Sequence, residues 1–224
     1  MKWLSFPTLA LDAEDMIERA AARRSEFVLP GSTTHYSNVN YMLLECIVEK
    51  AAGSDIRSVL AQQIFEPLSM CHTVYPTGTE IASPLRGYSF EAATGRLVDR
   101  TLMNPVSVGG AGAIVSTLED LHAYARALCR GDLLAPETQR VRLQSTPFEG
   151  GPALVGYGQG LGRLGRFCGH NGTIFGFSTE IWYLPEADAV IVVRVNLLDA
   201  DDRSQSIALF EAVAKQLFPD LVDW

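Results

Sequence analysis

Two short segments of the chain carry side chains of the kinds that transfer protons and bind amides. The first contains Tyr36, Ser37 and Asn38 and runs into an apolar helical pattern. A phenol can transfer a proton, and a carboxamide can hydrogen-bond an amide substrate. The same residues also suit the start of a helix, where Ser37 or Asn38 would accept hydrogen bonds from free backbone N–H groups while Tyr36 packs. The residues alone leave both interpretations open.

The second segment, residues 169–173, reads Gly-His-Asn-Gly-Thr and stands where one predicted strand gives way to the next. Glycines beside a histidine let a substrate approach the backbone closely, and histidine titrates near neutral pH. A hairpin with a surface histidine explains the same letters equally well. A third segment, residues 109–117, is rich in glycine and alanine, and its small residues favour close packing before a helix.

Other common signatures are missing or weak. The sequence contains no GxSxG, HExxH or Walker motif. Residues 160–165 match GxGxxG, but a strand follows where a dinucleotide site needs a helix, so these glycines are interpreted as hairpin or bulge positions. Cys46, Cys71, Cys129 and Cys168 have no metal-type spacing and are expected to be free thiols. We therefore expect no metal and no cofactor.

The composition is that of a folded domain with an acidic surface. Of 224 residues, 47% are hydrophobic, and 26 acidic against 18 basic side chains give a net charge of −8. This balance, without any basic run, argues against nucleic acid as a partner. No apolar run approaches the roughly 20 residues that span a membrane, and Asp12, Glu14 and Asp15 interrupt any signal peptide. The compartment stays undetermined; the cytoplasm is expected if Met1 is the true start.

Periodicity divides the chain into a mainly helical and loop region, about residues 1–147, and a strand-rich region, about 148–224. The predicted helices cover residues 8–24, 38–52, 54–65, 117–129, 136–145 and 203–217, and the predicted strands cover 153–168, 173–184 and 189–197. Ser116 and Glu119 fit a capping box, and residues 185–188 fit a turn. Helices followed by an antiparallel meander and a last helix indicate an α+β fold.

Together and in this order, the segments resemble the serine beta-lactamase superfamily, in the branch of class C beta-lactamases, D-alanyl-D-alanine carboxypeptidases and related esterases. PGSTTHYSNVNYMLLECIVEKAAG is similar to PGxxxxYSNxxYxLLGxIIExxxG, IFEPLSMCHT to the PLGM…T segment, and GGAGAIVSTLEDL to aGGlxSTxxDL. YGQGLG, GHNGTIFGF, YLPE and the strand ending in Asn196 match the C-terminal block. The resemblance implies a beta-lactamase/transpeptidase-like fold and acyl-enzyme chemistry on a beta-lactam, a D-Ala-D-Ala peptide or an ester.

The resemblance assigns Tyr36 and Asn38 to the first and last positions of a Tyr-x-Asn motif. The tyrosine of that motif assists proton transfer to the nucleophile or the leaving group, and the asparagine binds the substrate amide. Ser37, the middle residue, would serve proton transfer and hydrogen bonding to substrate.

The resemblance makes His170, Asn171 and Gly172 the histidine variant of Lys-Thr-Gly, on the strand that lines the cleft. Asn171 would contact substrate. The backbone N–H of Thr173 would be one of two oxyanion-hole donors, and the second would be the N–H of the nucleophilic serine.

That serine is where the sequence departs from the family, because the family nucleophile lies in Ser-x-x-Lys. The only lysines are Lys2, Lys50 and Lys215. Ile47 and Ala212 stand three residues before the last two, and nothing stands three residues before the first. The 224 residues therefore contain no nucleophile of this type.

Three hypotheses follow. The first is a serine hydrolase of which this is a truncated beta-lactamase-like domain, lacking the N-terminal strands and the nucleophile helix; such a chain would need a complementing N-terminal segment or would self-associate. The second is a catalytically inactive member that acts as a binding or interaction protein. The third makes Ser37 the nucleophile, although the family uses that serine for proton transfer. The expected ligand in each case is a small-molecule amide or ester.

Overall fold

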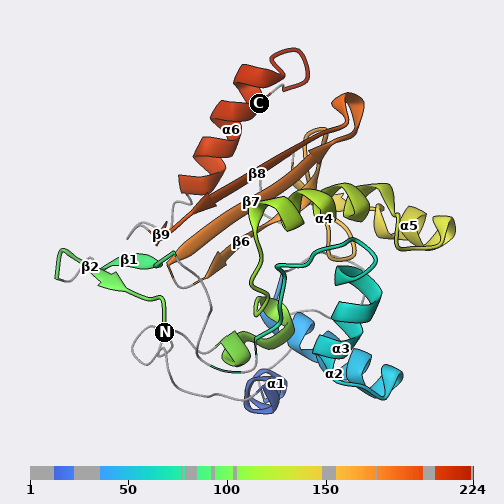
Figure 1. Cartoon of the computed structure of the whole chain (residues 1–224), viewed down its shortest axis with the longest axis vertical. Coiled ribbons are helices and arrows are strands. Elements are labelled where there is room, and N and C mark those ends of the chain that lie inside the picture. The colour runs from blue at the N-terminus through green and yellow to red at the C-terminus, as the bar shows by residue number, and fades with distance from the viewer. Residues whose placement is uncertain are drawn as a thin grey trace.

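The computed structural model describes residues 13–22, 36–76, 78, 85–91, 94–102, 105–147, 155–174, 176–198, 205–222 and 224 (Figure 1). Its α-helices are α1 (Ala13–Ala21), α2 (Asn38–Ala52), α3 (Ile56–Leu60), α4 (Leu118–Arg130), α5 (Pro136–Arg142) and α6 (Gln205–Leu217). The shorter helical turns are η2 (Ala61–Phe65), η3 (Pro105–Ala111) and η4 (Pro185–Ala187). None of the described helices is long and apolar enough to cross a bilayer.

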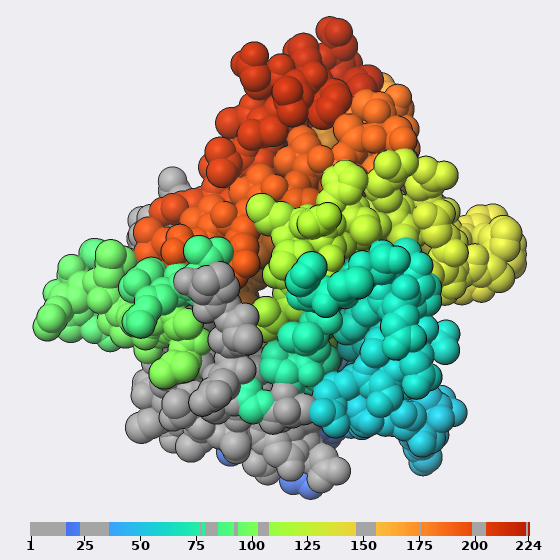
Figure 2. Space-filling model, viewed as in Figure 1, coloured from blue at the N-terminus to red at the C-terminus, as the bar shows by residue number. Residues whose placement is uncertain are grey.

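Six antiparallel strands form the main sheet, in the order β3-β4-β5-β6-β7-β8. They are β3 (Thr146–Pro147), β4 (Val155–Tyr157), β5 (Gly162–Leu164), β6 (Phe167–Ile174), β7 (Phe177–Leu184) and β8 (Ala189–Val195). A smaller sheet joins β1 (Tyr88–Glu91), β2 (Arg96–Asp99) and β9 (Leu197–Leu198), and its β1–β2 hairpin projects from the body of the molecule (Figures 1 and 2). The α+β architecture predicted from the sequence is confirmed.

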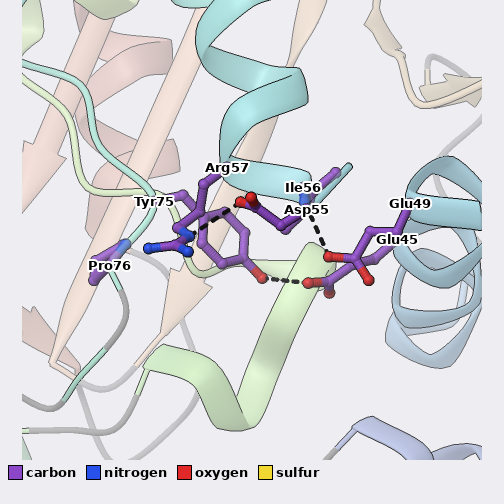
Figure 3. Close-up of a pocket in the computed structure, with 7 residues that line it drawn as sticks. All are labelled: Glu45, Glu49, Asp55, Ile56, Arg57, Tyr75 and Pro76. Atoms are coloured by element: carbon purple, nitrogen blue, oxygen red, sulfur yellow. Dashed lines mark hydrogen bonds and ion pairs between the residues drawn. The ribbon is translucent and has the colours of Figure 1, made fainter. Parts of the chain in front are cut away.

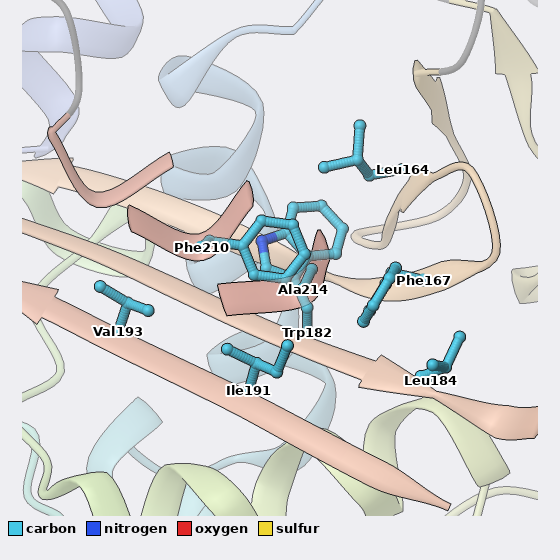
Figure 4. Close-up of a cluster of buried hydrophobic side chains, with 8 residues drawn as sticks. All are labelled: Leu164, Phe167, Trp182, Leu184, Ile191, Val193, Phe210 and Ala214. Carbon is cyan, nitrogen blue, oxygen red and sulfur yellow. The ribbon is translucent and has the colours of Figure 1, made fainter. Parts of the chain in front are cut away.

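The main sheet is covered by α6 on one face and α4 on the other (Figure 1). Phe210 of α6 is fully buried, with its ring 5.2 Å from Phe167 and 5.7 Å from Trp182. Burial of one such aromatic side chain contributes about 1.5–3 kcal/mol to folding. The cluster in Figure 4 consists of Leu164, Phe167, Trp182, Leu184, Ile191, Val193, Phe210 and Ala214.

The opposite face carries a second cluster against α4, made by Leu128, Cys129, Leu161, Cys168 and Tyr183. Alternate residues of a strand point to opposite faces. In β6, Phe167 therefore faces α6 while Cys168, His170 and Gly172 face the α4 side. One face of the sheet is therefore packed against α6, and the polar residues of β6 lie on the opposite face.

Helix α2 has the predicted bounds, and Gly53 ends it with φ +63°, in the left-handed region. Ser37 occupies the N-cap position, but its side chain makes no cap hydrogen bond. Helix α4 begins one residue later than predicted: Thr117, rather than Ser116, accepts the capping hydrogen bond from the Asp120 N–H at 3.2 Å. Ser116 instead hydrogen-bonds the hydroxyl of Thr73 at 2.7 Å, a long-range contact that local sequence does not reveal.

Several predicted boundaries are wrong in an informative way. The single strand predicted at 153–168 is divided into β4, β5 and the start of β6, because Gly160 and Gly165 turn the chain with positive φ. This confirms the hairpin interpretation of the GxGxxG letters. Residues 169–173 do not join two strands but lie inside β6. The hairpin β1–β2 lies within residues 72–108, where no strand was predicted, and the ends of the helix predicted at 8–24 lie outside the described residues.

Cys129 and Cys168 form a disulfide, which corrects the prediction of free thiols. The bond joins the last turn of α4 to β6 across 39 residues of sequence. Packing of α4 on the sheet buries both sulfurs side by side, and no local spacing encodes that contact. Cys71 is a free, exposed thiol, as predicted.

Candidate active site

Tyr36 and His170 come together from opposite halves of the chain, with ring centroids 6.0 Å apart. Tyr157 of β4 lies 5.7 Å from Tyr36 and 5.6 Å from His170. Tyr41, one turn into α2, lies 5.6 Å from Tyr36. We call these four residues the aromatic site cluster. It contains the two residues whose chemistry stood out in the sequence, at the junction between α2 and the main sheet.

The hydrogen bonds of the aromatic site cluster all have an assignable donor and acceptor. His170 Nδ1 lies 2.5 Å from the carbonyl oxygen of Asn171, and because a carbonyl only accepts, Nδ1 carries the proton. In the neutral ring, Nε2 is then the acceptor, and the Tyr157 hydroxyl donates to it across 3.0 Å. The Tyr41 hydroxyl hydrogen-bonds the Tyr157 hydroxyl in turn, donating to it because the Tyr157 proton is already used.

Burial sets the protonation states of the cluster. It lowers the pKa of His170 below its usual value near 6.5, against a smaller opposing effect of the hydrogen bond to Asn171. Burial also raises the pKa of Tyr36, with a further contribution from Tyr41. The pKa of Tyr157 is raised by burial first and then by its hydrogen bond with Tyr41. Near neutral pH His170 is therefore a neutral imidazole and Tyr36 and Tyr157 are protonated phenols, and Tyr36 remains 38% exposed and open to a ligand.

One edge of β6 is open beside this cluster. Strand β5 pairs with β6 only at Phe167, Cys168 and Gly169, so from His170 to Ile174 no strand of the described chain covers that edge. Such an edge offers backbone N–H and C=O groups to an extended ligand. The predicted oxyanion donor, the backbone N–H of Thr173, belongs to this stretch.

The remaining predicted residues lie on β6 and at the start of α2. Asn171, Gly172 and Thr173 are exposed, and a Cβ built on Gly172 would meet nothing within 4 Å. Strand alternation turns the side chains of Asn171 and Thr173 away from the face of His170. Ser37 and Asn38 start α2 directly after Tyr36, and neither side chain makes a hydrogen bond within the described part of the chain.

Sequence reasoning did not single out Tyr41 and Tyr157. Tyr41 lies in the apolar pattern that predicts the helix at 38–52, and Tyr157 is the first letter of YGQGLG. Both tyrosines lie inside segments that resemble the family, which was the available signal, but their hydroxyls meet across 116 residues of sequence. Only the fold brings them to His170.

A second feature is a shallow pocket of about 270 Å³ beside α2 (Figure 3). It is lined by Glu45, Glu49, Asp55, Ile56, Arg57, Tyr75 and Pro76. The protein itself satisfies its glutamates: Tyr75 Oη donates to Glu45 Oε1 at 2.8 Å, and the Ile56 N–H donates to Glu49 Oε1 at 2.9 Å. Among the described residues no three His, Cys, Asp or Glu side chains gather as metal ligands do.

Glu45 ties η3 to α2. Its Oε2 accepts from the Gly110 N–H at 2.5 Å, and a Cβ on Gly110 would lie 2.7 Å from the Tyr41 carbonyl oxygen. Gly109 adopts φ +47° with ψ −141°, a combination that essentially only glycine reaches. The close packing predicted for the glycine-rich segment is therefore confirmed, and it supports α2 where that helix carries Tyr41.

Comparison with known proteins decides the family. The sequence profile described as Beta-lactamase matches residues 2–214. The chain belongs to the beta-lactamase family. This agrees with the resemblance drawn from the Tyr-x-Asn and His-Asn-Gly segments. It relates the candidate site to those of serine hydrolases.

Three relatives illustrate the similarity. The chain is 26% identical over 172 residues to a D-aminopeptidase from Brucella canis, matching 75% of this chain and 32% of that protein. It is 25% identical to an unguisins hydrolase from Aspergillus campestris over 84% of this chain and 38% of that one. The structure of a D-stereospecific amidohydrolase from Streptomyces sp. superposes with a TM-score of 0.84 at 25% identity, covering 94% of this chain and 63% of that chain.

A D-amino acid amidase from Ochrobactrum anthropi SV3 gives a TM-score of 0.77 at 26% identity, over 96% of this chain and 66% of that one. An octameric penicillin-binding protein homologue from Pyrococcus abyssi gives 0.74 at 27%, over 93% and 48%. The chain spans about a third of the length of the curated relatives that it matches and under two thirds of the Streptomyces structure.

Proposed function

We propose that the chain forms the Tyr-x-Asn and His-Asn-Gly side of a serine hydrolase site that cleaves amide bonds next to a D-configured residue through an acyl-enzyme. The nucleophilic serine comes from a segment outside these 224 residues. The observation that carries the proposal is the meeting of Tyr36 and His170, 6.0 Å apart, at the open edge of β6. The substrate class is suggested by relatives described as a D-aminopeptidase, a D-stereospecific amidohydrolase and a D-amino acid amidase.

In the proposed reaction the serine Oγ forms a bond to the substrate carbonyl carbon, and the amide C–N bond then breaks. The Oγ proton passes to the departing amine by way of Tyr36 Oη. The Thr173 N–H and the N–H of the serine hold the oxyanion, and Asn38 hydrogen-bonds the substrate amide. Water then cleaves the ester by the same route in reverse, releasing the acid and restoring the serine.

The raised pKa of Tyr36 fits one half of this cycle. A protonated phenol can give a proton to the amine but cannot first take one from serine. An ammonium group beside the phenol would lower its pKa by stabilising the phenolate. The lysine of Ser-x-x-Lys is such a group, so the same external segment would bring both the nucleophile and the charge that prepares Tyr36.

Acylation of an extended protein tests the proposal. The chain would be produced with and without any in-frame upstream segment that carries Ser-x-x-Lys, then incubated with fluorescent penicillin and with D- and L-phenylalanine amide. We expect a covalent adduct by intact mass, and release of ammonia from the D-amide, only with the extended form. Tyr36→Phe should slow acylation about 10²–10⁴-fold, the usual contribution of a general acid–base group. Tyr124→Phe removes a hydroxyl from a partly buried tyrosine of α4 that packs on the second core cluster, and it should not slow acylation.

An adduct on the 224-residue chain alone would overturn the placement of the nucleophile and direct attention to Ser37. The second hypothesis, a binding protein without catalysis, is favoured by the absence of Ser-x-x-Lys from the sequence. It predicts reversible binding of the same D-amides, with no adduct and no ammonia in either form of the protein.

A further inference from the structure

A group of buried polar side chains connects β7 to the first turn of α6, on the face of the sheet opposite His170. Glu180 of β7 is fully buried. The Ser206 hydroxyl donates to Glu180 Oε1 at 2.9 Å, and the Trp182 indole N–H donates to Oε2 at 2.8 Å. Because the Ser206 proton is used in this way, the Ser178 hydroxyl donates to Ser206 Oγ across 2.5 Å. We call Ser178, Glu180, Trp182 and Ser206 the buried polar network.

The buried polar network lies beside the hydrophobic core under α6. Trp182 packs in the core cluster of Figure 4 with Val193 and Phe210. Ser178 and Ser206 are at most 1% exposed. A buried polar group that loses its partner is strongly disfavoured, so a network of this kind holds its members in one arrangement. Since Ser206 belongs to the first turn of α6, the network fixes the start of that helix against β7.

The strand register places the network directly beside the backbone of the candidate site. Ser178 pairs with Thr173 of β6, and Glu180 pairs with Asn171. The Cα atoms of such antiparallel partners lie about 4.5–5.5 Å apart. A shift of β7 at Ser178 or Glu180 is therefore passed to the stretch of β6 that carries the predicted oxyanion donor.

The two ends of β6 differ in how many strands hold them. Gly169 pairs with Trp182 of β7 on one side and with Gly162 of β5 on the other. From residue 170 to residue 174, β7 is the only strand of the described chain that pairs with β6. Within the sheet, this stretch therefore takes its position from β7 alone.

We propose that Glu180, with Ser178 and Ser206, positions the backbone N–H of Thr173 so that it can stabilise the oxyanion. This inference rests on the proposed function and adds positioning residues to it. The three side chains act through β7 and touch no substrate, because they lie between the sheet and α6. Displacement of a catalytic group by about 1 Å can slow a reaction about 10²-fold, so a partial loosening of Thr173 should slow acylation about tenfold.

Backbone relaxation of the chain tests the hold on β6. Ser178→Ala and Glu180→Gln each break the network beside the site. We expect the ¹⁵N order parameters of residues 171–173 to fall from about 0.85, the value of rigid backbone, to below about 0.6. Trp182→Phe is the matched control, because it removes a hydrogen bond from the same carboxylate but lies opposite Gly169, which β5 also holds. It should leave these order parameters unchanged.

Kinetics of the extended protein that carries Ser-x-x-Lys test the consequence for the reaction. With D-phenylalanine amide, Ser178→Ala and Glu180→Gln should lower kcat about tenfold and leave KM nearly unchanged. The reason is that the oxyanion develops only on the way to the transition state, so a misplaced donor weakens an interaction that the bound substrate does not make. Trp182→Phe should leave kcat within about twofold of the parent.

The outcomes separate this inference from the proposed function. Order parameters that stay at the parent values, or that fall equally in Trp182→Phe, overturn the positioning role and leave the proposed function standing. A looser β6 with an unchanged kcat also overturns it. Absence of acylation in the extended parent overturns the proposed function and the catalytic part of this inference with it. Circular dichroism verifies the fold of each variant, and Ser178→Ala alone decides the matter should Glu180→Gln fail to fold.

Discussion

The hydroxyl of Tyr157 lies 3.0 Å from Nε2 of His170, although the two residues come from different strands of the sheet. Because Nδ1 of the same ring donates to the Asn171 carbonyl, this hydroxyl hydrogen-bonds the neutral imidazole and holds its tautomer. His170 therefore acts as an oriented acceptor at the site, and Tyr157 is a positioning residue for it.

Substitution Tyr157→Phe should raise the pKa of His170. The tyrosine hydroxyl stabilises the neutral ring, so its loss favours the imidazolium, while the phenyl ring keeps most of the burial. The pKa would be followed by the Hε1 proton shift in a pH titration. Tyr124→Phe is the matched control, and an unchanged or lowered His170 pKa in Tyr157→Phe would refute the assigned direction of the hydrogen bond.

His170 should also make the folded chain sensitive to mild acid. Its pKa is lowered in the folded state, so the unfolded chain binds the proton first. The free energy of unfolding should then fall as the pH drops below about 6.5, the ordinary histidine value, until the folded form is protonated too. Urea unfolding at several pH values measures this, and His170→Gln should flatten the profile in that window. A profile equally steep in the variant would assign the effect elsewhere.

Substitution of glycine by alanine should have different effects on stability at two positions of β6. A Cβ on Gly169 would lie 1.9 Å from the Ile181 carbonyl oxygen, so Gly169→Ala should destabilise the fold by about 1–3 kcal/mol. Gly172→Ala meets open space and should stay within about 0.5 kcal/mol of the parent. It should nevertheless weaken binding of D-phenylalanine amide about tenfold, because the methyl enters the open edge of β6 where the substrate is proposed to bind. Unaltered binding would place the ligand elsewhere.

The sequence predicted those features of the fold that depend on residues close together in the chain. The bounds of α2 followed from apolar spacing and from Gly53, and the turn at Pro185 to Asp188 followed from its residue types. The pairing of Tyr36 with His170 came through family resemblance, and the fold then placed their rings together. The sequence could not show contacts made by distant packing, namely those of Tyr41 with Tyr157 and of Cys129 with Cys168.

An exposed apolar stripe on α2 should promote association of the chain. Leu43, Leu44 and Ile47 are 39%, 50% and 59% exposed and lie three or four residues apart or adjacent on the helix. Exposed apolar faces of this kind favour self-association or a partner. We expect binding of an apolar-surface dye and oligomers in sedimentation, both reduced by Ile47→Glu but not by Lys50→Glu. A dye-silent monomer would contradict this expectation.

The disulfide offers a direct test of how β6 is anchored. Cys129 and Cys168 are buried and close a loop across 39 residues, and a crosslink of that span stabilises a fold by about 2–4 kcal/mol. Cys129→Ala with Cys168→Ala should lower the free energy of unfolding by that amount, and reductant should then have no further effect. Cys71→Ala, at an exposed thiol, is the control and should leave stability within about 0.5 kcal/mol.

Because Cys168 stands two residues before His170, the double variant should also broaden the His170 resonances. Equal stability of parent and double variant, with sharp His170 signals, would show that β6 is held by the sheet alone.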